Sequence, residues 1–482
     1  MDIFFGSSQN IQDNLAKKFE GFKTLNEYVF ERPSSCLVML RHTRGESLFL
    51  ENETLEIVFD GYLHGTAGKE LAVKLFSVAE NLVNGKHIDF NEYGGLFNIC
   101  IRVKQDGKVF LKSDPSALLP LYYCLNEKHF YYSSHGHMLG SLLDAEPDYS
   151  GIMQKVTLGF TLGERYYYKD IKRINPGETI IYDPFDGKIA SRYDYVYYSG
   201  YNLEKNIEEE LFSGLNLSFE RIRKEYSEIG LMLSEGFDSR FLGGIARRNG
   251  FKISSYTHGT PGAGGKVIAD EVAEALNSDH FFSSMIDGYC HDDNEMVRQI
   301  YLSDNLNYPF WMAGAGYFKK RNAGYPVIIG SSLDSILGGN IFYKPAKHIK
   351  DAVIQRYSEI LKQDLGLLSE RYIEKLSSEL IQLTYLKSAG GQSKLIDQTF
   401  VTDVAGLLKK ELKFLNEHIE SEYDRIKRTG SSLTSLQLQR FVLENRDRKL
   451  FFGQPLTIRK YNKIYIPSFE FGFLSRASAV NP

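Results

Sequence analysis

The fold of the second half of this chain is decided by the stretch Leu231-Met232-Leu233-Ser234-Glu235-Gly236-Phe237-Asp238-Ser239-Arg240. Its apolar start suits a strand, and the apolar spacing after the polar turn predicts a helix that begins at that turn. The amino end of a helix carries unpaired backbone N–H groups and the positive end of the helix dipole. The turn is therefore suited to bind an anion, although an ordinary strand–helix turn also favours glycine, aspartate and serine.

Side chains in this turn, which we call the first motif (Ser234–Ser239), add to its affinity for phosphate groups. Ser234 and Ser239 supply hydroxyls, and Gly236 allows the backbone to approach a ligand closely. Asp238 is a carboxylate of the kind that holds magnesium beside phosphates. The first motif therefore predicts a site for a phosphorylated ligand and its metal ion.

Strands and helices alternate on both sides of the first motif. Apolar strands are predicted at Gly230–Leu233, Lys252–His258 and Val327–Ile329, with a helix at Val267–Leu276. This alternation is typical of a doubly wound parallel sheet, in which ligands bind at the carboxyl ends of the strands. Beyond about residue 345 the pattern predicts mostly helix.

The first 195 residues have a different pattern, with short β-rich segments and one predicted helix over Lys69–Val83. The predicted strands are Cys36–Leu40, Leu55–Phe59, Phe97–Val103, Lys108–Leu111 and Phe130–Ser133. Runs of strands with few helices favour a sandwich of sheets. A Tyr-, Ser- and Gly-rich segment around 193–202 separates the two patterns, so we predict domains at 1–198 and 199–482.

Composition narrows the class of protein. The 482 residues are 43% hydrophobic and 24% charged with a net charge of −4, which indicates a globular protein and does not favour a nucleic-acid partner. No apolar run reaches the roughly 18 residues of a membrane span, so we expect a cytoplasmic protein. The four cysteines are far apart, as expected for reduced thiols: Cys36, Cys100, Cys124 and Cys290.

The first motif resembles the pyrophosphate-binding S-G-G-x-D-S loop of the glutamine-dependent asparagine synthetases. Residues 328–339, Ile-Ile-Gly-Ser-Ser-Leu-Asp-Ser-Ile-Leu-Gly-Gly, are similar to that family's G-x-G-x-D-E-x-F-G-G element, and we call them the second motif. Between them, 254–259 and 269–276 resemble the adenine-contacting strand and the helix after it. Relatives in this family include β-lactam synthetases and lasso-peptide cyclases.

The N-terminal half carries a second resemblance to the same family. Residues 113–123, Ser-Asp-Pro-Ser-Ala-Leu-Leu-Pro-Leu-Tyr-Tyr, are similar to the R-D-x-x-G-x-x-P-L-Y-Y block of its glutaminase domain. Residues 171–178, Ile-Lys-Arg-Ile-Asn-Pro-Gly-Glu, are similar to its I-x-x-l-x-P-G-x element. The motifs occur in the family's order and extend across most of the chain.

The resemblance implies a fold, cofactors and site residues. The expected fold is an N-terminal glutaminase-like αββα sandwich of the N-terminal-nucleophile (Ntn) type, followed by a doubly wound PP-loop ATP-pyrophosphatase domain with a helical C-terminal region. The expected cofactors are ATP and Mg²⁺, with Asp238 and Asp334 as metal-binding and catalytic residues. The expected ATP-binding residues are Leu233, Ser234, Gly236, Ser239, His258, Gly259 and Ser332.

Four positions depart from the family pattern. The family's glutaminase uses a cysteine at position 2, where this chain has Asp2, so we do not expect glutamine hydrolysis. Glu235 replaces a glycine and places a carboxylate in the phosphate loop, unless its side chain points away. Ser335 stands where the second motif usually has an acidic residue, and Gly265 stands where an acidic residue often opens the following helix.

The expected function is an ATP-dependent amide ligase that activates a carboxylate as an acyl-adenylate and joins it to ammonia or another amine. Two alternatives remain: a specialised ligase that tailors a natural product, peptide or glycan, and a non-catalytic nucleotide-binding or interaction protein. The expected partners are a small-molecule or peptide carboxylate and an amine, with a homodimer left open.

The C-terminal segment leaves more than one interpretation of the catalytic lysine. Residues 440–448 and 464–469 resemble the family segment after which a charge-stabilising lysine usually follows. Either the chain is shortened at its C-terminus, naturally or otherwise, or another lysine serves, for which Lys460 and Lys463 are positional candidates.

Overall fold

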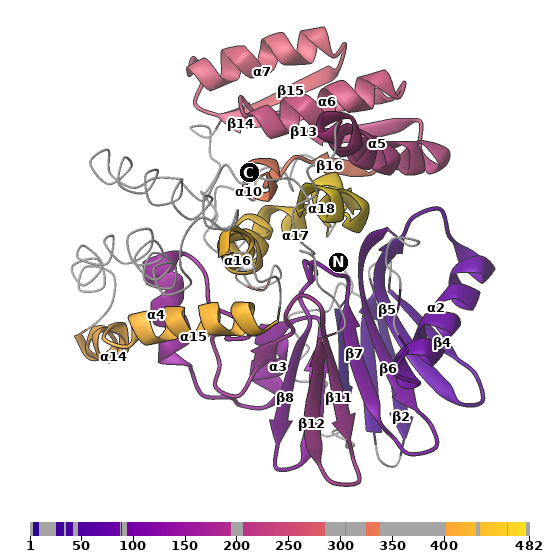
Figure 1. The fold of residues 1–482 in the computed structure, drawn as a ribbon, viewed down its shortest axis with the longest axis vertical. Coiled ribbons are helices and arrows are strands. Elements are labelled where there is room, and N and C mark those ends of the chain that lie inside the picture. The colour runs from indigo at the N-terminus through magenta and orange to yellow at the C-terminus, as the bar shows by residue number, and fades with distance from the viewer. Residues whose placement is uncertain are drawn as a thin grey trace.

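The computed structural model describes residues 3–8, 26–32, 35–41, 47–86, 88, 94–193, 206–284, 304, 324–337, 402–429, 434–459 and 461–478. Within these ranges the fold is mixed α/β, with two antiparallel sheets in the first half and one parallel sheet in the second (Figure 1). The helices predicted between residues 345 and 401 lie outside the described residues, as does the predicted boundary near residue 198.

Two six-stranded antiparallel sheets form the first domain. The order of the first sheet is β10 (Lys172–Arg173), β8 (Tyr122–Asn126), β9 (His129–Ser133), β1 (Ile3–Ser7), β3 (Ser35–Arg41) and β2 (Asn26–Arg32). The order of the second is β12 (Lys188–Tyr193), β11 (Glu178–Asp183), β7 (Val109–Ser113), β6 (Gly95–Val103), β5 (Leu55–Leu63) and β4 (Leu48–Glu51). The five strands predicted in this half are confirmed, with small shifts of their ends.

Side-chain alternation explains how these sheets stack into layers. Along β1, Phe4 packs between the two sheets, whereas Ile3 and Phe5 pack on the other face with helix α3 (Gly136–Leu142). Helix α2 (Gly68–Val83) covers the outer face of the second sheet with an apolar stripe that includes Leu71, Leu75, Val78 and Leu82. The layers are therefore helix, sheet, sheet and helix, as predicted.

The second domain contains a five-stranded parallel sheet. Its order is β15 (Asp279–Ser284), β14 (Lys252–Gly259), β13 (Glu228–Met232), β16 (Val327–Ile329) and β17 (Ile464–Tyr465). Successive strands step in one direction from β13 to β15, and then β16 pairs on the opposite side of β13. Such a reversal opens a crevice at the carboxyl ends of β13 and β16, which is where ligands bind in parallel α/β sheets.

Helices α5 (Ile207–Glu225), α6 (Phe237–Arg248) and α7 (Gly264–Ala275) accompany this sheet. Each has a buried apolar side, and one core joins them to the strands through residues such as Phe219, Leu242 and Ala273. The alternation of strands and helices predicted for residues 229–330 is confirmed where the structure describes it.

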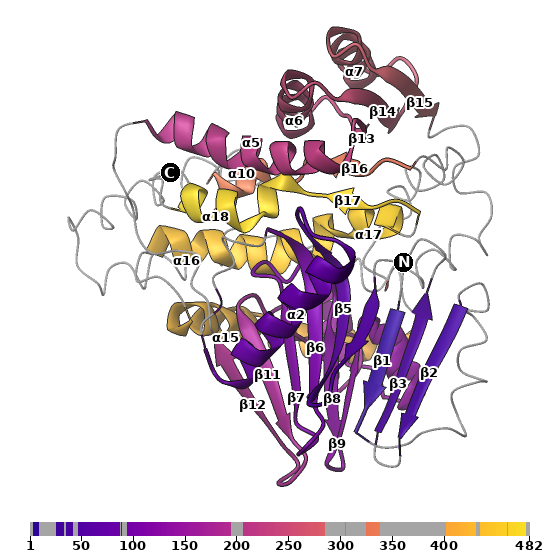
Figure 2. The same cartoon turned by 90° about the vertical axis from the view of Figure 1, so that its right-hand side faces the viewer.

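The C-terminal helices are α14 (Thr402–Leu412), α15 (Leu415–Arg428), α16 (Thr434–Phe441), the π-type helix η6 (Val442–Phe451), α17 (Gly453–Arg459) and α18 (Phe471–Ser478). Of these helices, α16, α17 and α18 lie between the sandwich and the parallel sheet, whereas α14 and α15 pack beside the sandwich next to helix α4 (Tyr149–Leu158) (Figures 1 and 2). Within the described ranges, no helix has both the length and the apolar character required to cross a membrane.

Candidate functional site

The first motif forms the connection between β13 and α6, at the crevice where the strand order reverses. The Ser234 N–H donates to Ser239 Oγ over 3.0 Å, and the Gly236 N–H donates to Ser234 Oγ over 3.1 Å. Residues 234–237 are nevertheless exposed, and the Phe237 side chain is 82% accessible. The turn is thus shaped by its own serines while its outer surface remains open to a ligand.

Gly330 brings the second motif against the first. A Cβ atom on Gly330 would lie 2.8 Å from the Ser239 nitrogen and 3.0 Å from the Asp238 carbonyl carbon. Only a glycine allows the end of β16 to pack this closely on the first turn of α6. The close approach sets residues 331–335 directly beside Asp238.

The two predicted metal-binding aspartates lie together at this junction. Asp238 Oδ2 accepts a hydrogen bond of 3.0 Å from the Leu333 N–H, and Asp334 Oδ1 accepts one of 2.8 Å from the Ser335 N–H. Burial and the negative charge of Asp334 raise the pKa of Asp238 above its usual value. A divalent cation between these carboxylates would relieve their repulsion, and carboxylate oxygens are ligands that Mg²⁺ prefers.

A third protein ligand for such an ion is not evident. Among the described residues, no group of three or more His, Cys, Asp or Glu side chains is arranged to hold a metal. Magnesium usually keeps several waters and binds substrate phosphates, so two carboxylates suffice for a site of that kind.

The predicted adenine-contacting residues border the same crevice. The Leu233 N–H donates to the Tyr256 carbonyl over 2.9 Å, and the Leu233 carbonyl accepts from Thr257 Oγ1 over 2.7 Å. Because its N–H is used within the sheet, Leu233 offers a ligand only the second lone pair of its carbonyl. His258 and Gly259 end the neighbouring strand β14, and burial lowers the pKa of His258, which keeps its imidazole neutral near pH 7.

Glu235 and Gly265 belong to one structural exchange. A Cβ atom on Gly265 would lie only 2.1 Å from Glu235 Oε2, so the Glu235 carboxylate occupies the space of a side chain at position 265. The glutamate therefore points toward the first turn of α7. The two departures from the family pattern, at positions 235 and 265, are therefore linked. The Glu235 side chain brings a carboxylate to the region where the family often has an acidic residue at the position of Gly265.

Asp447 in η6 is a buried residue at this site to which the sequence analysis assigned no role. Ser335 and Ser332 lie near its carboxylate, and Arg446 Nη1 lies 3.9 Å from Asp447 Oδ1. Neither carboxylate oxygen has a hydrogen-bond partner among the described residues, and burial raises the pKa of Asp447 to about 6. The Gln439 amide in α16 donates to the carbonyls of Ser335 and Ile336. The Arg-Asp-Arg sequence at 446–448 belongs to the segment that resembles the family's C-terminal region. No residue pattern near it in the sequence indicates that it packs beside the second motif.

Comparisons with known proteins support the resemblance of both halves. A family model described as a glutamine amidotransferase domain matches residues 81–194. Asparagine synthetase [glutamine-hydrolyzing] 1 of Bacillus subtilis (strain 168) is 23% identical over an alignment of 330 residues that covers 62% of this chain and 50% of that relative. The chain is therefore similar to an asparagine synthetase over more than half of its length. The match spans only half the length of the curated relative.

Two solved structures align with this chain at low scores. One is glutamine phosphoribosylpyrophosphate amidotransferase from B. subtilis complexed with ADP and GMP, with 9% identity and a TM-score of 0.26 over 59% of this chain and 90% of that one. The other is described as the allosteric regulatory enzyme of purine biosynthesis, with 10% identity and a TM-score of 0.25 over 58% and 64%. TM-scores this low do not establish a common fold.

Lys463 is wrong as a candidate for the catalytic lysine. It precedes β17, and its carbonyl accepts from the Val327 N–H at the amino end of β16, which is opposite to the first motif. Its Nζ lies 3.5 Å from Glu225 Oε2. Three tyrosine rings, of Tyr62, Tyr226 and Tyr465, surround it at 5.1 to 5.7 Å. Lys460 lies outside the described residues.

At the end of the sandwich where β1 begins, which we call the closed end, Arg459 of the C-terminal helix α17 pairs with a buried carboxylate of β5. At the opposite end, Ser7, the last residue of β1, lines one cavity with Glu56 near the start of β5 and with Arg102. The first residues of β1 therefore lie at the end of the sandwich where β5 finishes. Asp60 lies within β5, and its carboxylate accepts hydrogen bonds of 2.8 and 3.2 Å from the Arg459 guanidinium of α17. Asp2 lies outside the described residues, so its expected effect on glutamine hydrolysis stays a prediction.

Proposed function

We propose that this chain is an ATP-dependent ligase that forms an amide bond through an acyl-adenylate. The observation that carries the proposal is the convergence of Asp238 and Asp334, from two separate motifs, beside an exposed turn at a helix amino end. Helix amino ends favour phosphate, and paired carboxylates favour Mg²⁺, so the crevice has the two components that MgATP requires.

The proposed reaction has two steps. A carboxylate oxygen of the substrate bonds to the α-phosphorus of ATP while the bond from that phosphorus to the bridging oxygen breaks and pyrophosphate leaves. An amine then attacks the acyl carbon, loses a proton and displaces AMP. Mg²⁺ would supply charge neutralisation for the departing pyrophosphate.

Residues of the first motif have defined roles in this proposal. The N–H groups at the start of α6 and the hydroxyls of Ser234 and Ser239 would hold pyrophosphate oxygens, and Asp238 and Asp334 would hold the metal ion. The Glu235 carboxylate lies over Gly265. This placement supports the proposal because it turns the negative charge toward α7.

The amine is proposed to be ammonia or an amino substrate instead of glutamine. A glutaminase requires an accessible nucleophilic thiol, and the described cysteines Cys36, Cys100 and Cys124 are all buried. Burial raises the pKa of the Cys100 thiol well above its usual value and that of Cys124 to about 11. These two thiols are therefore protonated near neutral pH, which supports an amine that arrives from elsewhere.

The test is release of pyrophosphate from MgATP with a panel of amino-acid, peptide and other carboxylates, each with ammonium and with glutamine. We expect release that depends on one class of carboxylate and an amide product with ammonium or an amine. Amide formation with glutamine in place of ammonium would contradict the proposed amine source.

A binding measurement tests the non-catalytic alternative independently of the substrate. Millimolar MgATP is expected to raise the melting temperature, because a ligand that binds only the folded state stabilises it. No shift and no pyrophosphate release across the panel would overturn the proposed ligase.

A further inference from the structure

Two separate segments of the C-terminal region reach the second motif. Asp447 of η6 is buried near Ser332 and Ser335, and neither of its carboxylate oxygens has a hydrogen-bond partner among the described residues. From the other segment, the turn at Pro467–Phe469, Ser468 Oγ donates to the Ser331 carbonyl over 2.7 Å. Two elements that follow the second motif by more than a hundred residues therefore lie against it, and Ser468 bonds to it directly.

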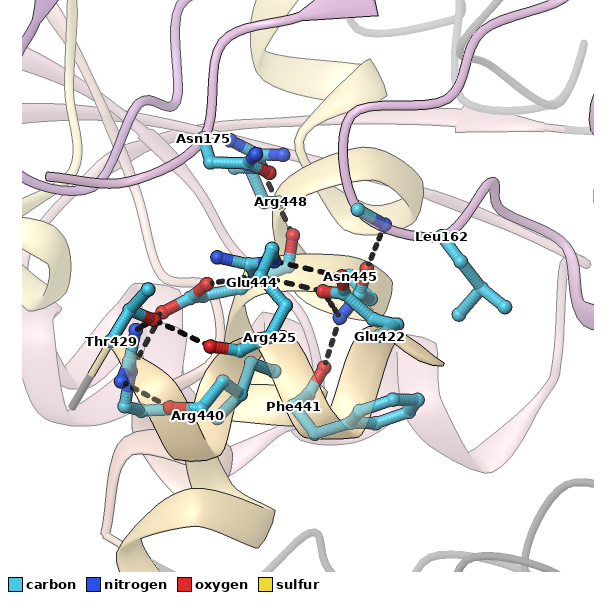
Figure 3. A network of polar contacts seen from close by, with 12 residues as sticks. Leu162, Asn175, Glu422, Arg425, Thr429, Arg440, Phe441, Glu444, Asn445 and Arg448 are labelled. Atoms are coloured by element: carbon cyan, nitrogen blue, oxygen red, sulfur yellow. Dashed lines mark hydrogen bonds and ion pairs between the residues drawn. The ribbon is translucent and has the colours of Figure 1, made fainter. Parts of the chain in front are cut away.

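The first of these segments, η6, is anchored on the sandwich domain on both sides of Asp447. Asn445 Oδ1 accepts from the Gly163 N–H over 2.7 Å, and the Arg448 guanidinium donates to the Ile174 carbonyl over 2.8 Å. Figure 3 shows Asn445 and Arg448 directed from the helix toward the chain at Leu162 and Asn175. Residues two apart on a helix point in nearly opposite directions, so anchoring Asn445 leaves Asp447 directed away from the sandwich.

Lys449 strengthens this anchor. Its Nζ donates to the Thr161 carbonyl over 2.8 Å, to Thr161 Oγ1 over 3.3 Å and to the Gly163 carbonyl. Three acceptors thus surround the amino group, although the side chain is fully buried and burial lowers its pKa well below the usual value. A buried amino group with these hydrogen bonds fixes the helix in one position more than a solvated lysine would.

The second segment is anchored on the sandwich through Ser116 and His64. Ser116 Oγ donates to the Phe469 carbonyl over 3.0 Å, and the His64 imidazole contacts the Glu470 carboxylate. The Glu470 carboxylate also accepts a hydrogen bond of 2.7 Å from Ser218 Oγ of α5. The residues on either side of this joint are buried, so water does not compete for these bonds.

We propose that the amidotransferase-like sandwich serves in this chain as the platform that positions the second motif, with Asp447 and Ser468 as positioning residues. The proposal rests on the proposed function, because it assigns the second motif to MgATP binding. It gives the sandwich a role in ligand binding, which is to hold Ser331–Ser335 against Asp238 in the geometry that the ligand requires.

The test compares MgATP affinity, by titration calorimetry at several Mg²⁺ concentrations, with the free energy of unfolding in urea. Ser116→Ala is the decisive variant, since Ser116 belongs to the sandwich and contacts neither motif. We expect Ser468→Ala to weaken MgATP about three- to tenfold and Ser116→Ala to weaken it less, as expected for loss of one hydrogen bond. Ser116→Thr and Ser468→Thr, which keep the hydroxyl, should restore affinity.

A matched control separates positioning from general stability. Ser133→Ala removes a buried hydroxyl that donates to the Phe4 carbonyl over 2.9 Å within the first sheet of the sandwich, away from both motifs. It should lower stability by a similar amount and leave MgATP affinity unchanged.

Each outcome decides between the two proposals. If the unchanged protein binds no MgATP, the proposed function fails first. If it binds MgATP, and folded Ser116→Ala and Ser468→Ala bind it as tightly as the unchanged protein does, the positioning role is overturned. Asp447→Asn adds a second probe of the η6 segment, and its MgATP affinity should fall with a changed dependence on Mg²⁺.

Discussion

The closed end of the sandwich and the carboxyl edge of the parallel sheet are both rich in polar side chains, but they differ in how those side chains are used. At the sandwich end, Asp60 is paired with Arg459 and also accepts from Ser47 Oγ over 2.9 Å, all away from solvent. At the sheet edge, residues 234–237 are exposed and the pKa of Asp238 is raised by burial and a neighbouring carboxylate.

The difference separates polar groups that stabilise the fold from polar groups that are suited to bind a ligand. Buried polar groups that satisfy one another stabilise a single arrangement of domains. Like charges held together at a crevice are unfavourable by themselves, and they persist where a ligand relieves them. The closed end of the sandwich has the first property, and the crevice at the parallel sheet, with its two neighbouring carboxylates, has the second.

The largest effect is expected from Asp238→Asn, which tests the crevice side of the comparison. The substitution removes a charge that binds the metal ion, so MgATP affinity should fall more than about a hundredfold by calorimetry. Stability without ligand should not fall, because the ionised carboxylate is unfavourable there. Asp186→Asn, at an exposed turn, is the control, and wild-type affinity in Asp238→Asn would contradict the site.

Arg459→Ala tests the closed end. Removing the guanidinium leaves the Asp60 carboxylate buried without its counter-charge, and breaking a buried pair costs about 3–5 kcal/mol in the free energy of unfolding. Urea denaturation measures this loss. The double variant Asp60→Asn/Arg459→Met should recover most of it, since neither buried charge remains. A loss below about 1 kcal/mol in the single variant would show that the pair does not hold the domains together.

Asp114 provides a pH-dependent test within the sandwich. Burial raises the pKa of its carboxyl to about 7, against about 3.9 in an unfolded chain. The folded state therefore keeps a proton that the unfolded state loses, so stability falls as pH rises from about 4 to 7, by up to about 4 kcal/mol. Asp114→Asn has no carboxyl that titrates at this position, so its unfolding free energy should rise relative to that of the wild type as pH increases from about 4 to 7. A difference that is constant with pH would contradict the buried, protonated carboxyl.

The smallest effect concerns Glu235 and Gly265. Gly265→Ala places a Cβ where the Glu235 carboxylate lies, so this flexible side chain must move, at a cost of less than about 1 kcal/mol in unfolding free energy. If the Glu235 carboxylate moves toward the proposed phosphate positions, the affinity for MgATP should fall by about tenfold or less. The double variant Glu235→Gly/Gly265→Glu should restore affinity, and additive losses would show that the two positions are not exchanged.

Sequence patterns predicted what is local in this molecule. Alternation and helical spacing placed β5, β6, β13, β14, α2 and α7, because each depends on residues close in the chain. The convergence of Asp238 and Asp334 was also foreseeable, since the carboxyl ends of parallel strands share one edge. Both side chains lie where the motifs predicted them, and their role in catalysis stays a prediction.

What could not be predicted depends on distant pairing. Asp447 meets Ser335 only because η6 packs beneath the second motif, and Asp60 meets Arg459 across 399 residues of sequence. The exchange between Glu235 and Gly265 required coordinates, since the sequence shows two unusual residues but not their contact. Lys463 failed as a candidate because proximity to a motif in sequence does not tell which end of a strand a residue occupies.

The last strand of the parallel sheet has a consequence for how this protein is made. Between Ile329 of β16 and Ile464 of β17 the ribosome adds 134 further residues, which takes roughly 7–27 seconds at ordinary elongation rates. During that interval one edge of β16 has no strand to pair with, and Ser468 has not yet been synthesised. A nascent chain is therefore expected to acquire nucleotide affinity only in the final stage of translation, and its open edge is the part that most needs protection from other chains until then.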